Sequence, residues 1–134
     1  MANNLTSKRA KACDISEKTK RAVFERDKGR CVVCGNSYNV MPNAHIVPRS
    51  AGGLGIETNI VTLCSNMTKN KCHYKYDFGS REERERIEKI ITRHMRKHYG
   101  SDWSRKDQYY KKYDYYEPLY WNEDEEEPEE DDWF

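Results

Sequence analysis

The stretch "NAHIVPRSAGGLGIETNIVTLC", residues 43–64, sets the plan of the middle of the chain. Its ends are rich in β-branched and apolar residues, and "YNVMPNAHIV", residues 38–47, has the alternation of a short hairpin. Pro48 and the three glycines between positions 52 and 55 preclude regular structure, so residues 48–58 are expected to form a loop. His45, Asn59 and Cys64 flank that loop and are the first candidates for chemistry.

Four cysteines surround this stretch at spacings that suit a metal. Cys31 and Cys34 form a Cys-x-x-Cys knuckle, and Cys64 and Cys72 can complete a tetrahedral zinc site. The second pair is separated by seven residues, so the usual ribbon spacing is met only by the first. The alternative, four ordinary buried thiols, requires a larger core than this composition provides. Cys13 has no partner by spacing and is expected to be a free thiol.

The length and composition of the chain predict one small domain. The chain has 134 residues, of which 36% are hydrophobic and 35% charged, so its core is modest and a structural zinc would supply folding energy. The N-terminus lacks the apolar run of a signal peptide, and no apolar segment reaches the length of a membrane span. We therefore expect a cytoplasmic protein without a membrane partner, in which clustered thiols stay reduced and bind metal.

Charge is distributed very unevenly. Residues 1–120 hold all 24 lysines and arginines against 14 acidic residues, a net charge of +10, whereas residues 121–134 hold nine acids and no base. A basic body favours a polyanionic partner such as nucleic acid. We expect residues 1–14 to be a flexible basic arm and residues 121–134 a disordered acidic tail.

Helix signals flank the cysteine region. Ser16 is a predicted N-cap for a helix that stops at Gly29, and Ser80 with Glu83 predicts a capping box for a helix over 80–98. Residues 101–121 could form a further helix ended by Pro118. The predicted domain therefore spans 15–120, with C-terminal helices over about 80–117.

His73 and Asp77 are spaced i and i+4, so on a helix they would share a face and could hold one divalent ion. Taken alone, the pair is better explained as a hydrogen bond on a helix surface. The order of the elements along the chain adds to this: a Cys-x-x-Cys knuckle, His45, Asn59 before Cys64, and then Cys72 and His73 with Asp77.

That order resembles the HNH (His-Asn-His) endonuclease family, in its small stand-alone phage or bacterial type with a four-cysteine zinc site. The matching stretches are "RDKGRCVVCG", "AHIVPRSAGGLG", "NIVTLC" and "CHYKYD", within residues 16–79. The resemblance implies an α+β, zinc-stapled fold with a ββα-metal (His-Me finger) core over about 31–79 and flanking helices.

The resemblance also implies a metal-dependent endonuclease acting on DNA, which we expect to be double-stranded. His45 would be the general base, Asn59 would tie the loop to the strand and orient that histidine, and His73 with Asp77 would hold a catalytic Mg²⁺ or Mn²⁺ that stabilises the leaving 3′-oxygen. Residues expected to bind the nucleic acid are Arg49, Ser50, Lys69, Lys71 and Lys75.

The sequence departs from the family pattern at Ala44, where many members carry a second metal ligand. The alternative is therefore a non-catalytic zinc-ribbon module that binds nucleic acid at a decayed nuclease site. Small members of this family occur in phage genomes, beside packaging genes, or in restriction systems, and the resemblance permits such partners without choosing among them.

Overall fold

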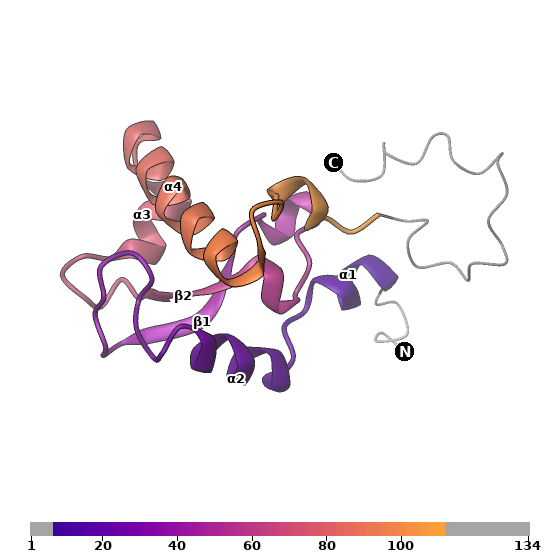
Figure 1. The fold of residues 1–134 in the computed structure, drawn as a ribbon, viewed down its shortest axis with the longest axis horizontal. Helices are drawn as coiled ribbons and strands as arrows, with labels where there is room; N and C mark the ends of the chain where they lie inside the picture. Colours follow the sequence, from indigo (N-terminus) through magenta and orange to yellow (C-terminus); the bar gives the residue numbers. More distant parts are fainter. Residues whose placement is uncertain (1–6, 112–134) are drawn as a thin grey trace, which may run out of the picture.

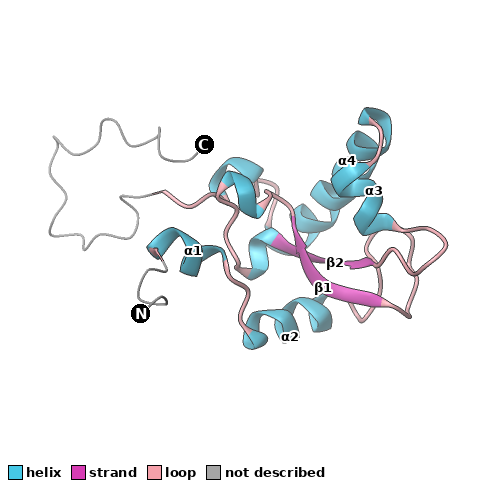
Figure 2. Ribbon diagram, turned by 180° about the vertical axis from the view of Figure 1, so that it is seen from behind, coloured by secondary structure: helices cyan, strands magenta, loops and turns pink. Residues whose placement is uncertain are grey.

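The structure, a computed structural model, describes residues 7–111 and has an α+β fold (Figure 1). A two-stranded antiparallel sheet of β1 (Val40–His45) and β2 (Ile60–Cys64) lies at its centre. Helix α2 (Glu17–Arg26) lies on one side of the sheet, and helices α3 (Cys72–Phe78) and α4 (Arg81–Tyr99) lie on the other, as Figure 2 shows from behind. The predicted α+β class is thus confirmed.

The strand pairing differs from the short hairpin expected within residues 38–47. Those residues supply one strand, and its partner is β2, with Val40 opposite Cys64 and His45 opposite Ile60. The register shifts between Met41 and Ala44. A partner so distant in sequence leaves no local signal, because the pairing is decided by burial of β2, all five of whose residues are buried.

Both capped helices form where the sequence predicts them. The Ser16 side chain accepts a hydrogen bond from the Thr19 amide, and Ser80 and Glu83 form the full capping box that starts α4. Isoleucines 87 and 91 and Met95 of α4 are buried, since their spacing places them on one face. They pack with Ile46, Val61, Leu63 and Trp103 in the main core.

The expectation of a flexible arm over residues 1–14 is wrong for the part that the structure describes. Residues Lys8–Cys13 form helix α1, which Ser7 caps and whose Cys13 side chain is buried. This segment crosses the glycine loop, where the Gly55 amide donates to the Ala12 carbonyl. A Cβ on Gly55 would lie 2.0 Å from the Asp14 carbonyl oxygen, so only glycine allows this approach. Residues 1–6 lie outside the described part.

The expected helix over 101–121 does not form within residues 101–111. Residues 105–107 make a single 3₁₀ turn, and the chain then runs beside the glycine loop. There the Leu54 amide donates to the Gln108 carbonyl and the Tyr110 amide to the Gly52 carbonyl. These bonds satisfy backbone amide and carbonyl groups of the glycine loop. Because the partners are distant in sequence, no local pattern predicts the pairing. The rest of that segment and the predicted acidic tail, residues 112–134, lie outside the described residues. Within the described part, no helix is both long and apolar enough to cross a membrane.

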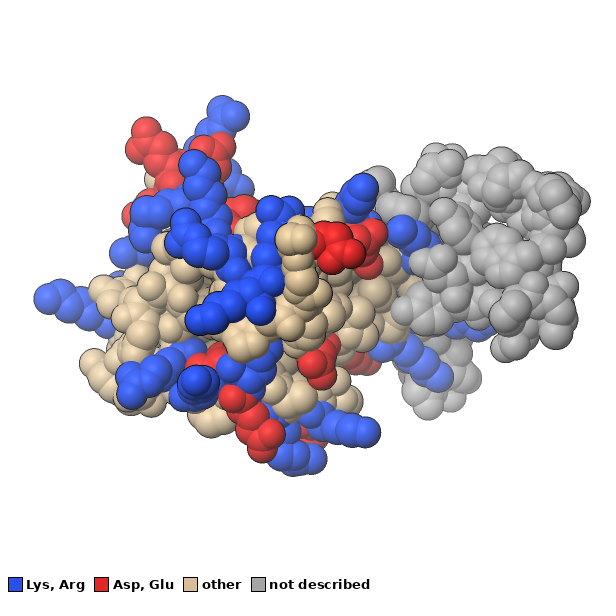
Figure 3. All heavy atoms as spheres, viewed as in Figure 1, with Lys and Arg blue, Asp and Glu red and all other residues tan. Residues whose placement is uncertain are grey.

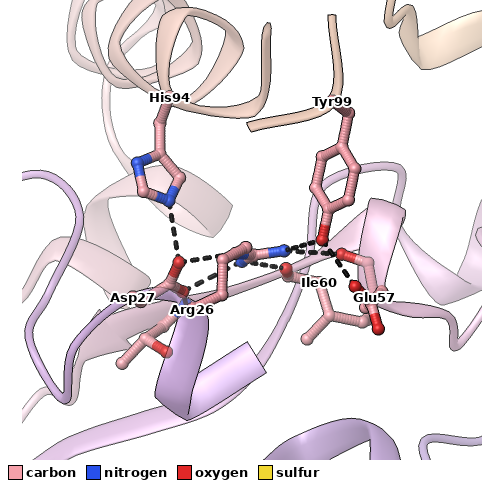
Figure 4. A network of polar contacts seen from close by, with 7 residues as sticks. Arg26, Asp27, Glu57, Ile60, His94 and Tyr99 are labelled. Atoms are coloured by element: carbon pink, nitrogen blue, oxygen red, sulfur yellow. Dashed lines mark hydrogen bonds and ion pairs between the residues drawn. The ribbon is translucent and has the colours of Figure 1, made fainter. Parts of the chain in front are cut away.

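A buried polar network joins the two sides of the sheet (Figure 4). The Arg26 guanidinium donates to both carboxylate oxygens of Asp27, at 2.7 and 2.9 Å, and to the Ile60 carbonyl at 2.8 Å. Tyr99 of α4 accepts from Arg26 and donates to Glu57. Burial alone would raise the pKa of Asp27, but hydrogen bonds from His94 and Arg26 lower it to about 2.

Candidate functional site

The four cysteines predicted to bind zinc lie together. The sulfur atoms of Cys31, Cys34, Cys64 and Cys72 all lie within 4.8 Å of one another, and those of Cys34 and Cys64 are 3.7 Å apart. A tetrahedron of thiolates with Zn–S bonds of about 2.3 Å has sulfur–sulfur edges of about 3.8 Å. The cluster could therefore hold a metal such as zinc.

The chemistry of these thiols also suits a metal. A hydrogen bond from the Cys72 thiol lowers the pKa of Cys31 and raises the pKa of Cys72, so within this pair Cys31 is the first to form the thiolate that metals bind. The backbone amide of Cys72 donates a hydrogen bond to the Cys64 sulfur at 3.3 Å, which holds the start of α3 against the end of β2. Cys13, expected to be a free thiol, is buried in α1 and lies outside the cluster.

A second feature, a polar hollow of about 510 Å³, lies at the other end of the strand pair. It is bounded by the end of β1, the turn that follows, one face of α3, and the first half of α4 with Arg105. Five of the predicted site residues line it together: His45, Arg49, Ser50, His73 and Asp77. His73 and Asp77 project from one face of α3, with Nε2 and Oδ2 3.4 Å apart.

The His45 ring is held by the N-terminal segment. Its Nε2 lies 3.0 Å from the Cys13 carbonyl, which fixes Nε2 as the protonated nitrogen. Burial lowers the pKa of His45, and the hydrogen bond to Cys13 offsets this only in part. His45 is therefore neutral near pH 7. No sequence pattern indicates this contact, because α1 is too short to show periodicity.

Asn59 ties the loop to the sheet. Its side chain is fully buried, accepts from the Val47 amide at 2.9 Å, and donates to the carbonyls of Val47 and Leu54 at 3.2 and 2.8 Å. It makes no hydrogen bond to the His45 ring, so the direct orientation of that ring comes from Cys13. Asn59 acts on His45 only by fixing the backbone two residues beyond it.

Strand alternation separates Ala44 from its neighbours. Ala44 points into the core and is fully buried, whereas Asn43 and His45 line the polar hollow. A side chain at position 44 would therefore face the core. The Oδ1 atom of Asn43 is buried and has no hydrogen-bond partner among the described residues. Nothing in the sequence pattern indicates this unpartnered oxygen.

The residues predicted to bind nucleic acid divide into two groups. Arg49 and Ser50 line the polar hollow, where Arg49 forms an ion pair with Asp14. Lys69 and Lys71 lie in the exposed loop before α3, and Lys75 lies on α3 about 200° around the helix from His73. None of these three lysines lines the hollow.

Two arginines at the hollow were missed by sequence reasoning. Arg84, in the first turns of α4, and Arg105 both line it. Arg105 donates to both oxygens of Glu88 at 2.7 Å and to the Tyr76 hydroxyl at 3.3 Å. Arg84 follows the predicted cap at Ser80 by four residues, so the helix face could have indicated it. Arg105 comes from the segment whose helix did not form.

Comparisons with protein-family models, with curated proteins and with solved structures gave no match. The resemblance to the HNH endonucleases therefore rests on the motifs of the chain itself.

Proposed function

We propose that this protein is a metal-dependent DNA endonuclease that hydrolyses phosphodiester bonds, with His45 as general base. The observation that carries the proposal is the convergence of His45, His73 and Asp77 on one polar hollow. These residues come from a strand end and from a helix, 28 or more positions apart in sequence. A neutral imidazole beside a His–carboxylate pair is the arrangement that water activation on a phosphodiester needs.

His45 supplies the proton transfer in this proposal. With Nε2 donating to the Cys13 carbonyl, Nδ1 is the nitrogen left to accept a proton, and it has no hydrogen-bond partner among residues 7–111. The attacking water would give that proton to Nδ1 as its oxygen bonds to phosphorus and the bond to the leaving oxygen breaks. The charged imidazolium would then be stabilised by the same carbonyl.

His73 and Asp77 would hold the divalent ion. An imidazole nitrogen and a carboxylate oxygen 3.4 Å apart at one hollow suit a divalent cation such as Mg²⁺ or Mn²⁺. When bound, such an ion supplies positive charge that offsets the charge developing on the phosphate and on the leaving oxygen.

The charge of the surroundings suits a polyanion. Arg49, Arg84 and Arg105 surround the hollow, and lysines and arginines spread over α4 and the middle of the molecule (Figure 3). Arg49 is half exposed in its pair with Asp14, so a DNA phosphate would replace that carboxylate as its partner.

The test is conversion of supercoiled plasmid to nicked or linear DNA with added Mg²⁺ or Mn²⁺. We expect His45→Ala to lower the rate by at least 100-fold, the typical contribution of a general base. His98→Ala is the matched control, because His98 is exposed on α4 away from the hollow, and it should leave the rate unchanged. Folded, zinc-loaded wild-type protein that cuts no DNA with either ion would refute the proposal.

A non-catalytic zinc-containing module that binds nucleic acid is the second candidate. The Arg49–Asp14 ion pair favours it. Arg49 is the arginine nearest to His45 in sequence, and Asp14 already neutralises its guanidinium. This candidate predicts salt-sensitive DNA binding without cleavage and no effect of His45→Ala on that binding.

A further inference from the structure

An exposed aromatic pair stands at the rim of the polar hollow. Phe78, the last residue of α3, lines the hollow and is 72% exposed. Tyr74, one turn earlier, is 51% exposed, and the two ring centroids are 5.3 Å apart. The opposite side of α3 buries Cys72, so this aromatic face is not needed for the core. Aromatic rings held together in solvent beside a polar cavity indicate a contact surface.

An unpaired guanidinium lies at the same rim. Arg49 is paired with Asp14, and Arg105 is paired with Glu88. Arg84 lines the hollow as well, but its guanidinium has no ion pair or hydrogen bond to any residue within 7–111. Arg84 also lines a neighbouring hollow of about 330 Å³, and Glu88 and Arg105 line both hollows.

The short connection between the two helices fixes this arrangement. Phe78 is followed by Gly79, the C-cap of α3, and by Ser80, whose capping box with Glu83 starts α4. A Cβ on Gly79 would lie 2.4 Å from the Lys75 carbonyl, so the tight turn requires glycine. Phe78 and Arg84 are therefore held on rigid helix ends on either side of this turn.

We infer that Phe78 and Arg84 form a binding subsite for one nucleotide with an unpaired base, next to the phosphate that is cut. The base stacks on the Phe78 ring, which Tyr74 supports, and the phosphate of that nucleotide binds Arg84. The inference rests on the proposed function and sharpens its substrate. An intact duplex keeps its bases stacked inside, so the preferred DNA is single-stranded or locally unpaired, in place of the duplex expected from the family resemblance.

The test measures binding by fluorescence anisotropy, without added divalent ion so that no cleavage occurs. The probes are a labelled single-stranded oligonucleotide and a hairpin duplex of the same length. We expect the wild type to prefer the single strand. Phe78→Ala should weaken single-strand binding by about tenfold, since base stacking on an aromatic ring contributes about 1–3 kcal/mol, and should leave duplex binding unchanged. Phe78→Trp should preserve or strengthen single-strand binding.

Arg84→Ala should weaken single-strand binding and lower the slope of log affinity against log salt by about 0.7, the value for one lost phosphate contact on a single strand. The matched controls are Tyr38→Ala, an aromatic residue 63% exposed outside the hollow, and Arg86→Ala, an exposed arginine of α4 that lines neither hollow. Both controls should bind like the wild type.

Equal weakening of single-strand and duplex binding by Phe78→Ala, or no weakening, would overturn the inference. So would concentration-dependent self-association that Phe78→Ala abolishes, because a second copy of the chain would then be the occupant. Failure of the two proposals is distinguishable. If the wild type cuts plasmid but neither Phe78→Ala nor Arg84→Ala changes single-strand binding, only the subsite is refuted. If Phe78→Ala weakens single-strand binding but the wild type cuts no DNA, only the nuclease proposal is refuted.

Discussion

The imidazole Nε2 of His94 lies 2.7 Å from the buried Oδ1 of Asp27, and this contact joins α4 to the end of α2. The other carboxylate oxygen of Asp27 accepts from the Thr62 amide of β2 at 2.9 Å. One carboxylate thus holds together all three layers of the fold.

Acid should weaken the fold through this carboxylate. The pKa of Asp27 falls from 3.8 to about 2 on folding, so its stabilising contribution is complete above about pH 3.8 and is lost as the pH falls towards 2. We expect Asp27→Asn to lower the free energy of unfolding by about 3 kcal/mol at pH 7, the usual cost of breaking a buried charged pair. Chemical denaturation as a function of pH measures both effects.

Glu17→Gln is the control for that experiment, because the Glu17–Lys20 pair is exposed. Such pairs contribute little, so the change should stay within about 0.5 kcal/mol. An unfolding free energy of Asp27→Asn that equals the wild type at every pH would contradict the role given to Asp27.

The crossing of the N-terminal segment over the glycine loop predicts a sharp steric effect. Gly55→Ala would place a methyl group 2.0 Å from the Asp14 carbonyl oxygen, so the segment must shift. We expect a loss of about 2 kcal/mol or more in the free energy of unfolding. The chemical shifts of the His45 ring, followed by NMR, should also change, because its partner is the Cys13 carbonyl.

Gly35→Ala is the matched control for the steric effect. Gly35 has a φ of +79° but no atom within 4 Å of its ideal Cβ, so only the backbone strain of about 1 kcal/mol is expected. The His45 signals should not move in this variant. If Gly55→Ala behaved in the same way, the close crossing would be disproved.

Metal analysis should find one zinc ion per chain, and removal of that ion by a strong chelator should unfold the protein. The physical reason is that the binding energy of a structural zinc is part of the folding free energy, which matters most for a small core. Cys34→Ser should lose the zinc, whereas Cys13→Ala should retain it, because Cys13 lies outside the cluster. Full folding of the zinc-free protein would contradict this prediction.

The pH dependence of cleavage reports on His45. A general base must be unprotonated, and burial lowers the pKa of His45 below its usual 6.5. The midpoint of the acidic limb of the rate at limiting substrate should therefore lie below pH 6.5. An acidic limb centred above 6.5 would exclude His45 as that base.

Local signals were sufficient for much of this fold. The caps at Ser16 and Ser80 and the cysteine spacing each depend on residues close in sequence or on ligand chemistry, and they were read correctly. Local signals do not predict features that depend on hydrogen bonds between distant segments. These features are the pairing of residues 40–45 with 60–64, the helix at 8–13 and the course of residues 108–110.

The same division holds for the candidate site. The resemblance to the HNH endonucleases implies a common role for His45, His73 and Asp77, and all three line one hollow. Asn43 and Arg84 are not among the residues selected from the sequence, although the face of the helix that begins at Ser80 could have indicated Arg84. An asparagine in a strand and an arginine in a charged helix are ordinary until the structure reveals that one oxygen is buried without a partner and that one guanidinium lacks a carboxylate among the described residues.

Cys72 and His73 are consecutive residues at the start of α3, one in the cysteine cluster and the other in the polar hollow. One residue inserted between them would rotate every later side chain of α3 by about 100°, carrying His73 and Asp77 off the hollow while leaving all four thiols in place. Such an insertion would keep the cysteine cluster but displace two of the residues proposed for cleavage. The proposed function therefore requires that the chain length between the two features stays fixed.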